Sequence, residues 1–173
     1  MPPITPRGRE INADAARPLD AISLARTMLR SAKTAAIATL DPGGYPYSTA
    51  TNIAVDDAGK PFIYMAGLSL HARNIALDDR VSITIADMDK DVLTTPRLSL
   101  VGRARRVEGA AYETLKQRYM ERFPKSKLYL ALPDSSIFYI ETEAVQLNGG
   151  PTQNANSVTP LDLVEDLAPT TAG

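Results

Sequence analysis

The sequence of 173 residues contains no cysteine and a single histidine. Without cysteine the chain has no disulfides, no thiol catalysis and no thiolate metal site. One histidine is too few for a histidine-rich metal centre. Asp87, Asp89 and Asp91 alternate along one segment, but the glycine and terminal glutamate of a calcium-binding loop are missing. The sequence therefore predicts no metal site.

The sequence also lacks an excess of charge of either sign and any long apolar run. Its 19 basic and 20 acidic residues give a formal net charge of −1, whereas nucleic-acid-binding domains carry a basic patch or stripe. No apolar run reaches the roughly 20 residues of a membrane-spanning helix, and residues 1–10 lack the apolar core of a signal peptide. We therefore expect no nucleic-acid partner, no membrane association and a cytoplasmic location.

Length and composition indicate one domain with an extension at each end. Hydrophobic residues make up 44% of the chain, which is enough for an ordinary packed core. Residues 1–17 are rich in proline, arginine and alanine without periodicity, and we predict a flexible N-terminal arm. Residues 18–150 form the predicted domain. Residues 151–173 form a C-terminal tail, a loose strap in which 161–167 has the pattern of one short helix.

Short β-branched and apolar runs, separated by turn signals such as 41–44, predict antiparallel strands because such turns are too short for parallel crossovers. The expected strands are 34–40, 47–55, 61–66, 80–87, 97–107, 136–142 and 144–147. Gly102 marks a bend within its strand. Apolar residues at helical spacing predict helices, which are expected at 20–32, 69–77 and 110–123. The pattern predicts a mainly β (α+β) fold, an antiparallel six- or seven-stranded split β-barrel with peripheral helices.

The most informative segment is the polar helix start at 68–77, between two strand-like runs. Ser69 can cap this helix with its hydroxyl, and His71 and Asn74 add hydrogen-bond donors beside it. A helix N-terminus carries partial positive charge and unpaired N–H groups, which suit a phosphate, and the planar guanidinium of Arg73 can grip one. Taken alone, however, the segment fits a capped surface helix with a solvated arginine better than a binding site.

The rest of the chain favours a binding site over a surface helix. The segments concerned, in this order, are 34–40 (TAAIATL), 44–50 (GYPYSTA), 68–75 (LSLHARNI), 78–82 (DDRVS), 95–104 (TPRLSLVGRA) and 144–150 (AVQLNGG). Together they resemble the pyridoxamine 5'-phosphate oxidase-like FMN-binding split-barrel family. The chain is most similar to the haem-utilisation (HugZ-like) branch, without the C-terminal domain of that branch. The resemblance implies a homodimer that holds two FMN molecules at the subunit interface.

The resemblance also implies cofactor-binding residues, namely Ser48, Thr49, Ala50, Thr51, Met65, Ala66, Ser69, His71, Arg73, Asn74 and Arg97. The first four would face the flavin ring and ribityl chain, the next two would line the same cavity, and the helix start would meet the phosphate. Ala66 stands where the family carries a serine. No catalytic residue is predicted, because in a flavin site the isoalloxazine ring performs the chemistry.

Three functions are compatible with the sequence. The first is an FMN-dependent oxidoreductase of unknown small-molecule substrate. The alternative is a non-enzymatic flavin- or haem-binding protein, and a third is a structural dimer that has lost its cofactor site. Pyridoxamine 5'-phosphate oxidase activity itself is disfavoured, because residues 146–173 contain no cation for a substrate phosphate. Without the further domain of the longer relatives, we expect no haem degradation by this chain alone.

Overall fold

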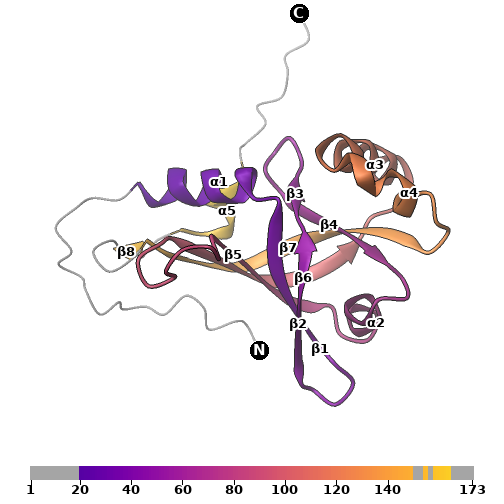
Figure 1. The fold of residues 1–173 in the computed structure, drawn as a ribbon, viewed down its shortest axis with the longest axis horizontal. Coiled ribbons are helices and arrows are strands. Elements are labelled where there is room, and N and C mark those ends of the chain that lie inside the picture. Colours follow the sequence, from indigo (N-terminus) through magenta and orange to yellow (C-terminus); the bar gives the residue numbers. More distant parts are fainter. Residues whose placement is uncertain (1–19, 150–153, 156–157, 165–173) are drawn as a thin grey trace, which may run out of the picture.

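A computed structural model describes residues 20–149, 154–155 and 158–164 (Figure 1). The expected arm at 1–17 lies outside these residues. The helical elements are α1 (Ala21–Ser31), α2 (Leu70–Leu77), α3 (Gly109–Arg122), η1 (Pro124–Ser126), α4 (Lys127–Leu130) and α5 (Pro160–Leu163). The strands are β1 (Thr34–Leu40), β2 (Pro46–Asn52), β3 (Ala54–Val55), β4 (Pro61–Ala66), β5 (Arg80–Ala86), β6 (Arg97–Arg106), β7 (Ser135–Asn148) and β8 (Asn154–Ala155). No described helix is both long and apolar enough to cross a lipid bilayer.

The strands form one antiparallel sheet in the order β2-β1-β5-β6-β7-β4-β3, with β8 paired to β7. Tight turns fix this order locally. Between β1 and β2 the amide of Gly44, at a φ of 82°, donates to the carbonyl of Asp41 over 2.9 Å. The curled sheet and its peripheral helices, which Figure 1 shows around it, confirm the predicted split barrel.

The barrel is filled by alternate side chains of its strands. The fully buried members include Ile37, Ile63, Ile83, Leu98, Leu100 and Leu147. α1 contributes Ala25 and Leu29 to this core. Burial of large aliphatic side chains of this kind is the main stabilising contribution to such a fold.

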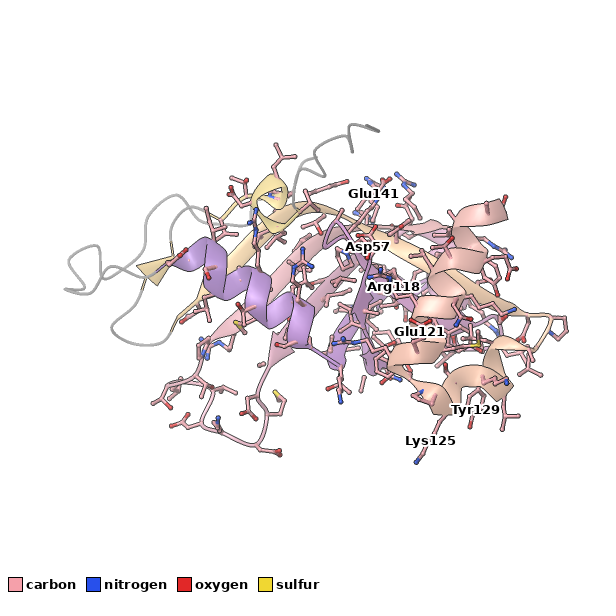
Figure 2. The ribbon with its side chains drawn as sticks, turned by 90° about the horizontal axis from the view of Figure 1, so that it is seen from above. Asp57, Arg118, Glu121, Lys125, Tyr129 and Glu141 are labelled. Carbon is pink, nitrogen blue, oxygen red and sulfur yellow. The ribbon has the colours of Figure 1, made fainter. Side chains whose placement is uncertain are left out.

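A second, smaller core lies between the sheet and α3. Phe62 of β4 faces Tyr119 of α3, with ring centroids 6.2 Å apart, whereas its neighbour Ile63 points into the barrel. α3 is also held to the turn after β3, because Arg118 donates to the carbonyl of Val55 and pairs with Asp57 (Figure 2). β4 is therefore covered on both faces.

Two expected strand boundaries are wrong. The strand expected at 47–55 is interrupted at Ile53, a fully buried residue between β2 and β3. The two strands expected at 136–142 and 144–147 are one strand, β7, in which Glu143 is left over in the pairing with β6. This β-bulge changes which residues of β7 face the core, so the alternation in the sequence breaks at that point.

The described part of the C-terminal segment packs against α1. Arg26 donates from Nε to the carbonyl of Asp162 over 2.5 Å and from its terminal nitrogen to that of Val164 over 3.2 Å. Thr159 and Asp162 cap α5 reciprocally, and Leu163 is buried. The short helix expected at 161–167 is observed at Pro160–Leu163, and residues 165–167 lie outside the described chain. We call residues 158–164 the strap.

Candidate functional site

The start of α2 is organised by Ser69, as the sequence predicts. Its hydroxyl accepts from the amide of Ala72 over 3.4 Å and donates to the carbonyl of Ala66 over 2.7 Å. The first bond caps the helix and the second joins the cap to the end of β4. α2 has no acidic residue in its first turn. The helix N-terminus therefore keeps its partial positive charge uncompensated within the helix.

His71 lies beside this cap. Its Nε2 is 3.3 Å from the hydroxyl of Ser69. The side chain is half-buried, and burial lowers the pKa of His71 below its ordinary value. The imidazole is therefore neutral at pH 7, with one nitrogen that donates and one that accepts.

Arg73 differs from every other described arginine. The others are engaged by a carboxylate, a backbone carbonyl or another group of the chain. The guanidinium of Arg73 makes no hydrogen bond or ion pair with a described residue and is exposed. It borders a cavity of about 450 Å³ between α2 and the ends of β4, β6 and β7, which we call the α2 cavity; Met65, Gly67, Arg105, Arg106, Ser136 and Phe138 also line it.

Asn74 and Ala66 have structural roles in this chain. Asn74 is 5% exposed, and its amide nitrogen donates to the hydroxyl of Thr39 in β1 over 2.9 Å. This bond turns the side chain into the barrel and anchors α2. The solvent-facing polar groups of the helix start are therefore Ser69, His71 and Arg73. Ala66 offers its carbonyl to Ser69.

The β2 residues lie elsewhere. Ser48 pairs with Ala38 and Thr49 with Ile37, so Ser48 and Ala50 lie on the outer face of the sheet while Thr49 and Thr51 share the side of the core. Ser48, Thr49 and Ala50 border a hollow of about 570 Å³ on the β1–β2–β5 face, which we call the outer hollow. Thr51 does not line it.

Arg97 lies near the outer hollow and far from α2. It opens β6 opposite Ala86, which lines the hollow, and its guanidinium donates to the carbonyl of Val92. The α2 cavity lies at the other end of β6, beside Ala104. Ten residues of strand separate the two ends by roughly 30 Å. The expected site residues therefore form two separate groups within one chain.

Sequence reasoning missed a third hollow of about 430 Å³ between β4 and α3. Tyr64, Tyr119 and Phe123 form its wall, with centroids 5.8 Å and 4.8 Å apart along that series. Burial raises the pKa of Tyr119 to about 12. Tyr129 and Lys125 reach the same hollow from the end of the α3–α4 unit (Figure 2). In the sequence, Tyr119 and Phe123 are apolar residues at helical spacing within the expected 110–123 helix, and this pattern indicates packing in a core and not a hollow.

Arg122, one of the cations that line this third hollow, is bound to backbone carbonyls of the chain. Arg122 donates from one nitrogen to the carbonyls of Arg30, Ser31 and Ala32, over 3.0, 3.1 and 2.6 Å. It thereby satisfies carbonyls that the C-terminus of α1 leaves unpaired. Elsewhere in the described chain, no three acidic or histidine side chains gather closely enough to hold a metal ion.

Comparison with known proteins identifies relatives over most of the chain. A sequence profile described as pyridoxamine 5'-phosphate oxidase matches residues 23–149. The chloroplastic noncanonical haem oxygenase HOZ of Arabidopsis thaliana is 26% identical over 107 residues, which are 62% of this chain and 33% of that protein.

Solved structures show the same similarity. Atu2129 of Agrobacterium tumefaciens strain C58, a protein of unknown function, is 48% identical with a TM-score of 0.79, over 96% of this chain and 66% of that one. A haem-binding protein from Mycobacterium smegmatis is 28% identical with a TM-score of 0.75, over 85% of this chain and 60% of that one. The chain thus spans about two thirds or less of the length of these relatives.

Proposed function

Because this chain belongs to the pyridoxamine 5'-phosphate oxidase family, we propose that it binds FMN and acts as an FMN-dependent oxidoreductase on a small-molecule substrate. The residues at the start of α2 fit the 5'-phosphate of such a cofactor. The first amide groups of α2 supply donors, and no acidic residue in the first turn of the helix opposes an anion.

The observation that carries the proposal is the free guanidinium of Arg73. An arginine without a carboxylate or carbonyl partner is ready to bind an external anion, and phosphate matches its planar fork. Arg73 also borders the α2 cavity, where Arg106 adds a cation at the rim and Met65 and Phe138 supply apolar wall. FMN carries a phosphate attached to a largely apolar ring system, so its site requires a cation close to an apolar wall.

When bound, FMN supplies the redox chemistry through its isoalloxazine ring. The protein's part is to hold the phosphate, to orient the ring and to control access of solvent and substrate. Arg73 and the first amide groups of α2 hold the phosphate end in this proposal, and Ser69 positions that helix end through its bonds to Ala66 and Ala72. His71 stays neutral, and its Nε2 donates to the hydroxyl of Ser69, because that hydroxyl itself donates to the carbonyl of Ala66.

The experiment is a comparison of FMN with riboflavin. A charge-assisted hydrogen bond contributes about 1.5–3 kcal/mol, so Arg73→Ala should weaken FMN binding about 10- to 100-fold and leave riboflavin binding nearly unchanged. Calorimetric titration of both ligands gives the measurement. Arg80→Ala is the matched control, because Arg80 is also exposed but is paired with Asp78. Equal losses for both ligands would show that the phosphate is not held by Arg73.

The absorbance spectrum of the untreated protein tests whether a flavin is retained. Turnover is tested separately, by anaerobic reduction of the bound flavin with NADH or NADPH and reoxidation by candidate acceptors. A flavin that binds and is never reduced by these donors would assign the chain to the non-enzymatic binding proteins of this fold.

A second candidate, haem binding, is favoured by two relatives named as a haem-binding protein and a haem oxygenase and by His71. Iron binds the neutral imidazole, and burial keeps His71 in that form. Titration with haemin should then give a Soret band shifted from that of free haemin, and His71→Ala should abolish the shift. An unchanged haemin spectrum in the presence of the wild-type protein excludes this candidate.

We also propose that a homodimer completes the site. Within one chain the outer hollow and the α2 cavity lie at opposite ends of β6. A second copy that covers the outer hollow of the first would bring Ser48 and Arg97 of one protomer toward α2 of the other. This arrangement is what supports a cofactor position at the subunit interface.

A further inference from the structure

Two buried polar groups that belong to the wall of the third hollow have no hydrogen-bond partner among the described residues. They are the hydroxyl of Ser126, a residue that is 8% exposed, and Nε of Arg122. Both residues line the hollow. Buried donors are normally paired, because an unpaired one costs free energy. The two groups therefore mark a place where an acceptor atom of a ligand can be bound.

The side chain of Ser126 is turned inward from the η1–α4 segment. Ser126 lies four residues before Leu130, which is 1% exposed and packs in the same core as Tyr119. Side chains four residues apart share one face of a helix, so Ser126 faces the same side as Leu130. Lys127 and Leu128, on other faces of the segment, are exposed. The hydroxyl is therefore directed toward the space between β4 and α3 and away from solvent.

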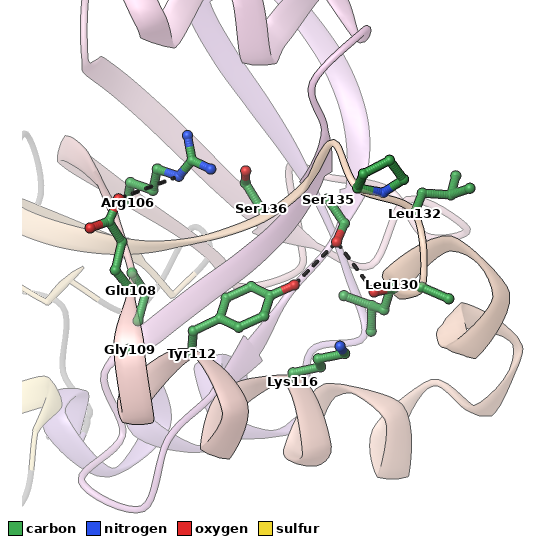
Figure 3. A pocket seen from close by; sticks show the side chains of 12 residues that line it. Arg106, Glu108, Gly109, Tyr112, Lys116, Leu130, Leu132, Ser135 and Ser136 are labelled. Atoms are coloured by element: carbon green, nitrogen blue, oxygen red, sulfur yellow. Dashed lines mark hydrogen bonds and ion pairs between the residues drawn. The ribbon is translucent and has the colours of Figure 1, made fainter.

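The α4 side of the hollow is held in place from two directions. The hydroxyl of Tyr64 donates to the carbonyl of Tyr129 over 3.1 Å, which joins α4 to β4. The hydroxyl of Ser135 donates to the carbonyl of Leu130 over 3.3 Å and lies 3.1 Å from the hydroxyl of Tyr112, which joins α4 to β7 and α3 (Figure 3). The hollow is therefore formed before a ligand enters it.

The positive charge of the buried donor pair is compensated within the fold. One terminal nitrogen of Arg122 donates to three carbonyls at the C-terminus of α1, the negative end of that helix. Lys33 and Lys125 also line the hollow, but both are exposed, so solvent screens their charge. A phosphate is best held by the parallel N–H groups of a free guanidinium fork, and Arg122 has part of its fork bound to α1. The remaining donors therefore suit an uncharged acceptor.

We infer that the third hollow binds a planar aromatic carbonyl compound, such as a quinone. A carbonyl oxygen has two lone pairs, and Nε of Arg122 and the hydroxyl of Ser126 supply two donors. The ring of the ligand packs against Tyr64, Tyr119 and Phe123, because aromatic rings attract one another in stacked and edge-to-face arrangements. The volume of about 430 Å³ lies within the range of small-molecule sites, about 300–1,000 Å³. This inference concerns binding alone and does not depend on a flavin.

The test compares menadione, a naphthoquinone, with methylnaphthalene, which has the same ring system without the carbonyl oxygens. Equilibrium dialysis of the full chain against each compound gives the two dissociation constants. The chain has no cysteine, so addition of a thiol to the quinone does not interfere. The wild-type protein should bind menadione about tenfold more tightly than methylnaphthalene, because only menadione pairs the two buried donors.

Ser126→Ala should weaken menadione binding about three- to tenfold and leave methylnaphthalene binding unchanged. Without a ligand, the thermal midpoint of this variant should equal or exceed that of the wild type, because the hydroxyl it removes is unpaired. Ser23→Ala is the matched control, because Ser23 is exposed on α1 and does not line the hollow. Lys125→Ala should also leave menadione binding unchanged, because the ligand carries no charge.

Equal affinity of the wild type for the two compounds overturns this inference, and so does a Ser126→Ala variant that binds menadione as the wild type does. A lowered thermal midpoint for Ser126→Ala would show that the hydroxyl serves the fold, which overturns it as well. Tighter binding of pyridoxine 5'-phosphate than of menadione, lost in Lys125→Ala, would assign the hollow to an anion and also overturn it. Each of these outcomes leaves the proposed FMN binding unaffected, because that is measured with FMN and riboflavin.

Discussion

At the scale of single residues, the buried bond from Asn74 to Thr39 joins α2 to β1. Thr39→Val keeps the shape of the side chain but removes the acceptor, so the amide of Asn74 is left unsatisfied in the barrel. We expect the free energy of unfolding to fall by about 1–3 kcal/mol, measured by urea denaturation. Thr34→Val, exposed on the same strand, should change it by less than about 0.5 kcal/mol. Equal stabilities for the two variants would contradict this role.

His71 gives a prediction about pH. Burial lowers the pKa of the folded imidazole, while the unfolded chain keeps a value of about 6.5. The unfolded state therefore binds the proton more readily, and the stability that His71 contributes is complete above about pH 6.5 and is lost as the pH falls through its folded pKa. The wild-type protein should lose more stability between about pH 7.5 and pH 5.5 than His71→Gln. Parallel pH profiles for the two proteins would argue against a buried neutral imidazole.

The sequence identified the polar residues of α2 but not their directions. The cap by Ser69 is a contact between neighbours along the chain, so its pattern is visible locally. The partner of Asn74 is 35 residues away, and the freedom of Arg73 depends on where every nearby carboxylate lies. Such relations arise from tertiary packing and have no local signature.

At the scale of elements, β6 and β7 approach each other closely at Gly102. A Cβ there would lie 2.0 Å from the carbonyl oxygen of Glu141, so the two strands must separate to accept it. Gly102→Ala should cost about 1–3 kcal/mol of stability, seen as a lower thermal midpoint. Gly43→Ala is the control, because its added carbon meets only side-chain atoms at 3.3 Å or more. A Gly102→Ala protein as stable as Gly43→Ala would show that the strand pair is looser than described.

The elements that were predicted well are those whose apolar residues recur with one constant period from end to end. The apolar spacing of α1 and the alternation of β1 run without interruption, and both were located within one residue. β7 was divided because Glu143 adds one residue and reverses which positions face the core. β8 and α4 are too short to carry a periodic signal.

At the scale of the whole molecule, the outer face of β1, β2 and β5 is covered by no helix of the described chain, whereas α3 covers β4 (Figure 1). Its small side chains, which include Ala36, Ser48 and Ala50, suit close contact with a second copy. We expect a homodimer by light scattering. Ala50→Glu should shift the mass toward the monomer, because a buried unpaired charge is costly.

The control for that change is Ala111→Glu, the same substitution on the exposed side of α3, which should leave the dimer intact. A wild-type protein that is monomeric at micromolar concentration would contradict the homodimer.

The resemblance to the split-barrel family predicted that the residues of the outer hollow and of the α2 cavity belong to one site. The resemblance did not predict that these two groups of residues lie apart within one chain. Their separation follows from the length of β6.

The strap has a consequence for how the protein is made. Arg26 binds carbonyls 136 and 138 positions later in the chain, so a growing polypeptide cannot form these contacts until residue 164 has left the ribosome. Until then the outward side of α1 stays uncovered, including the surface that Val158 and Leu163 occupy in the finished fold. Contacts between such distant residues slow folding. This end of the barrel is therefore the last to close during synthesis and the region where a nascent chain most needs protection from aggregation.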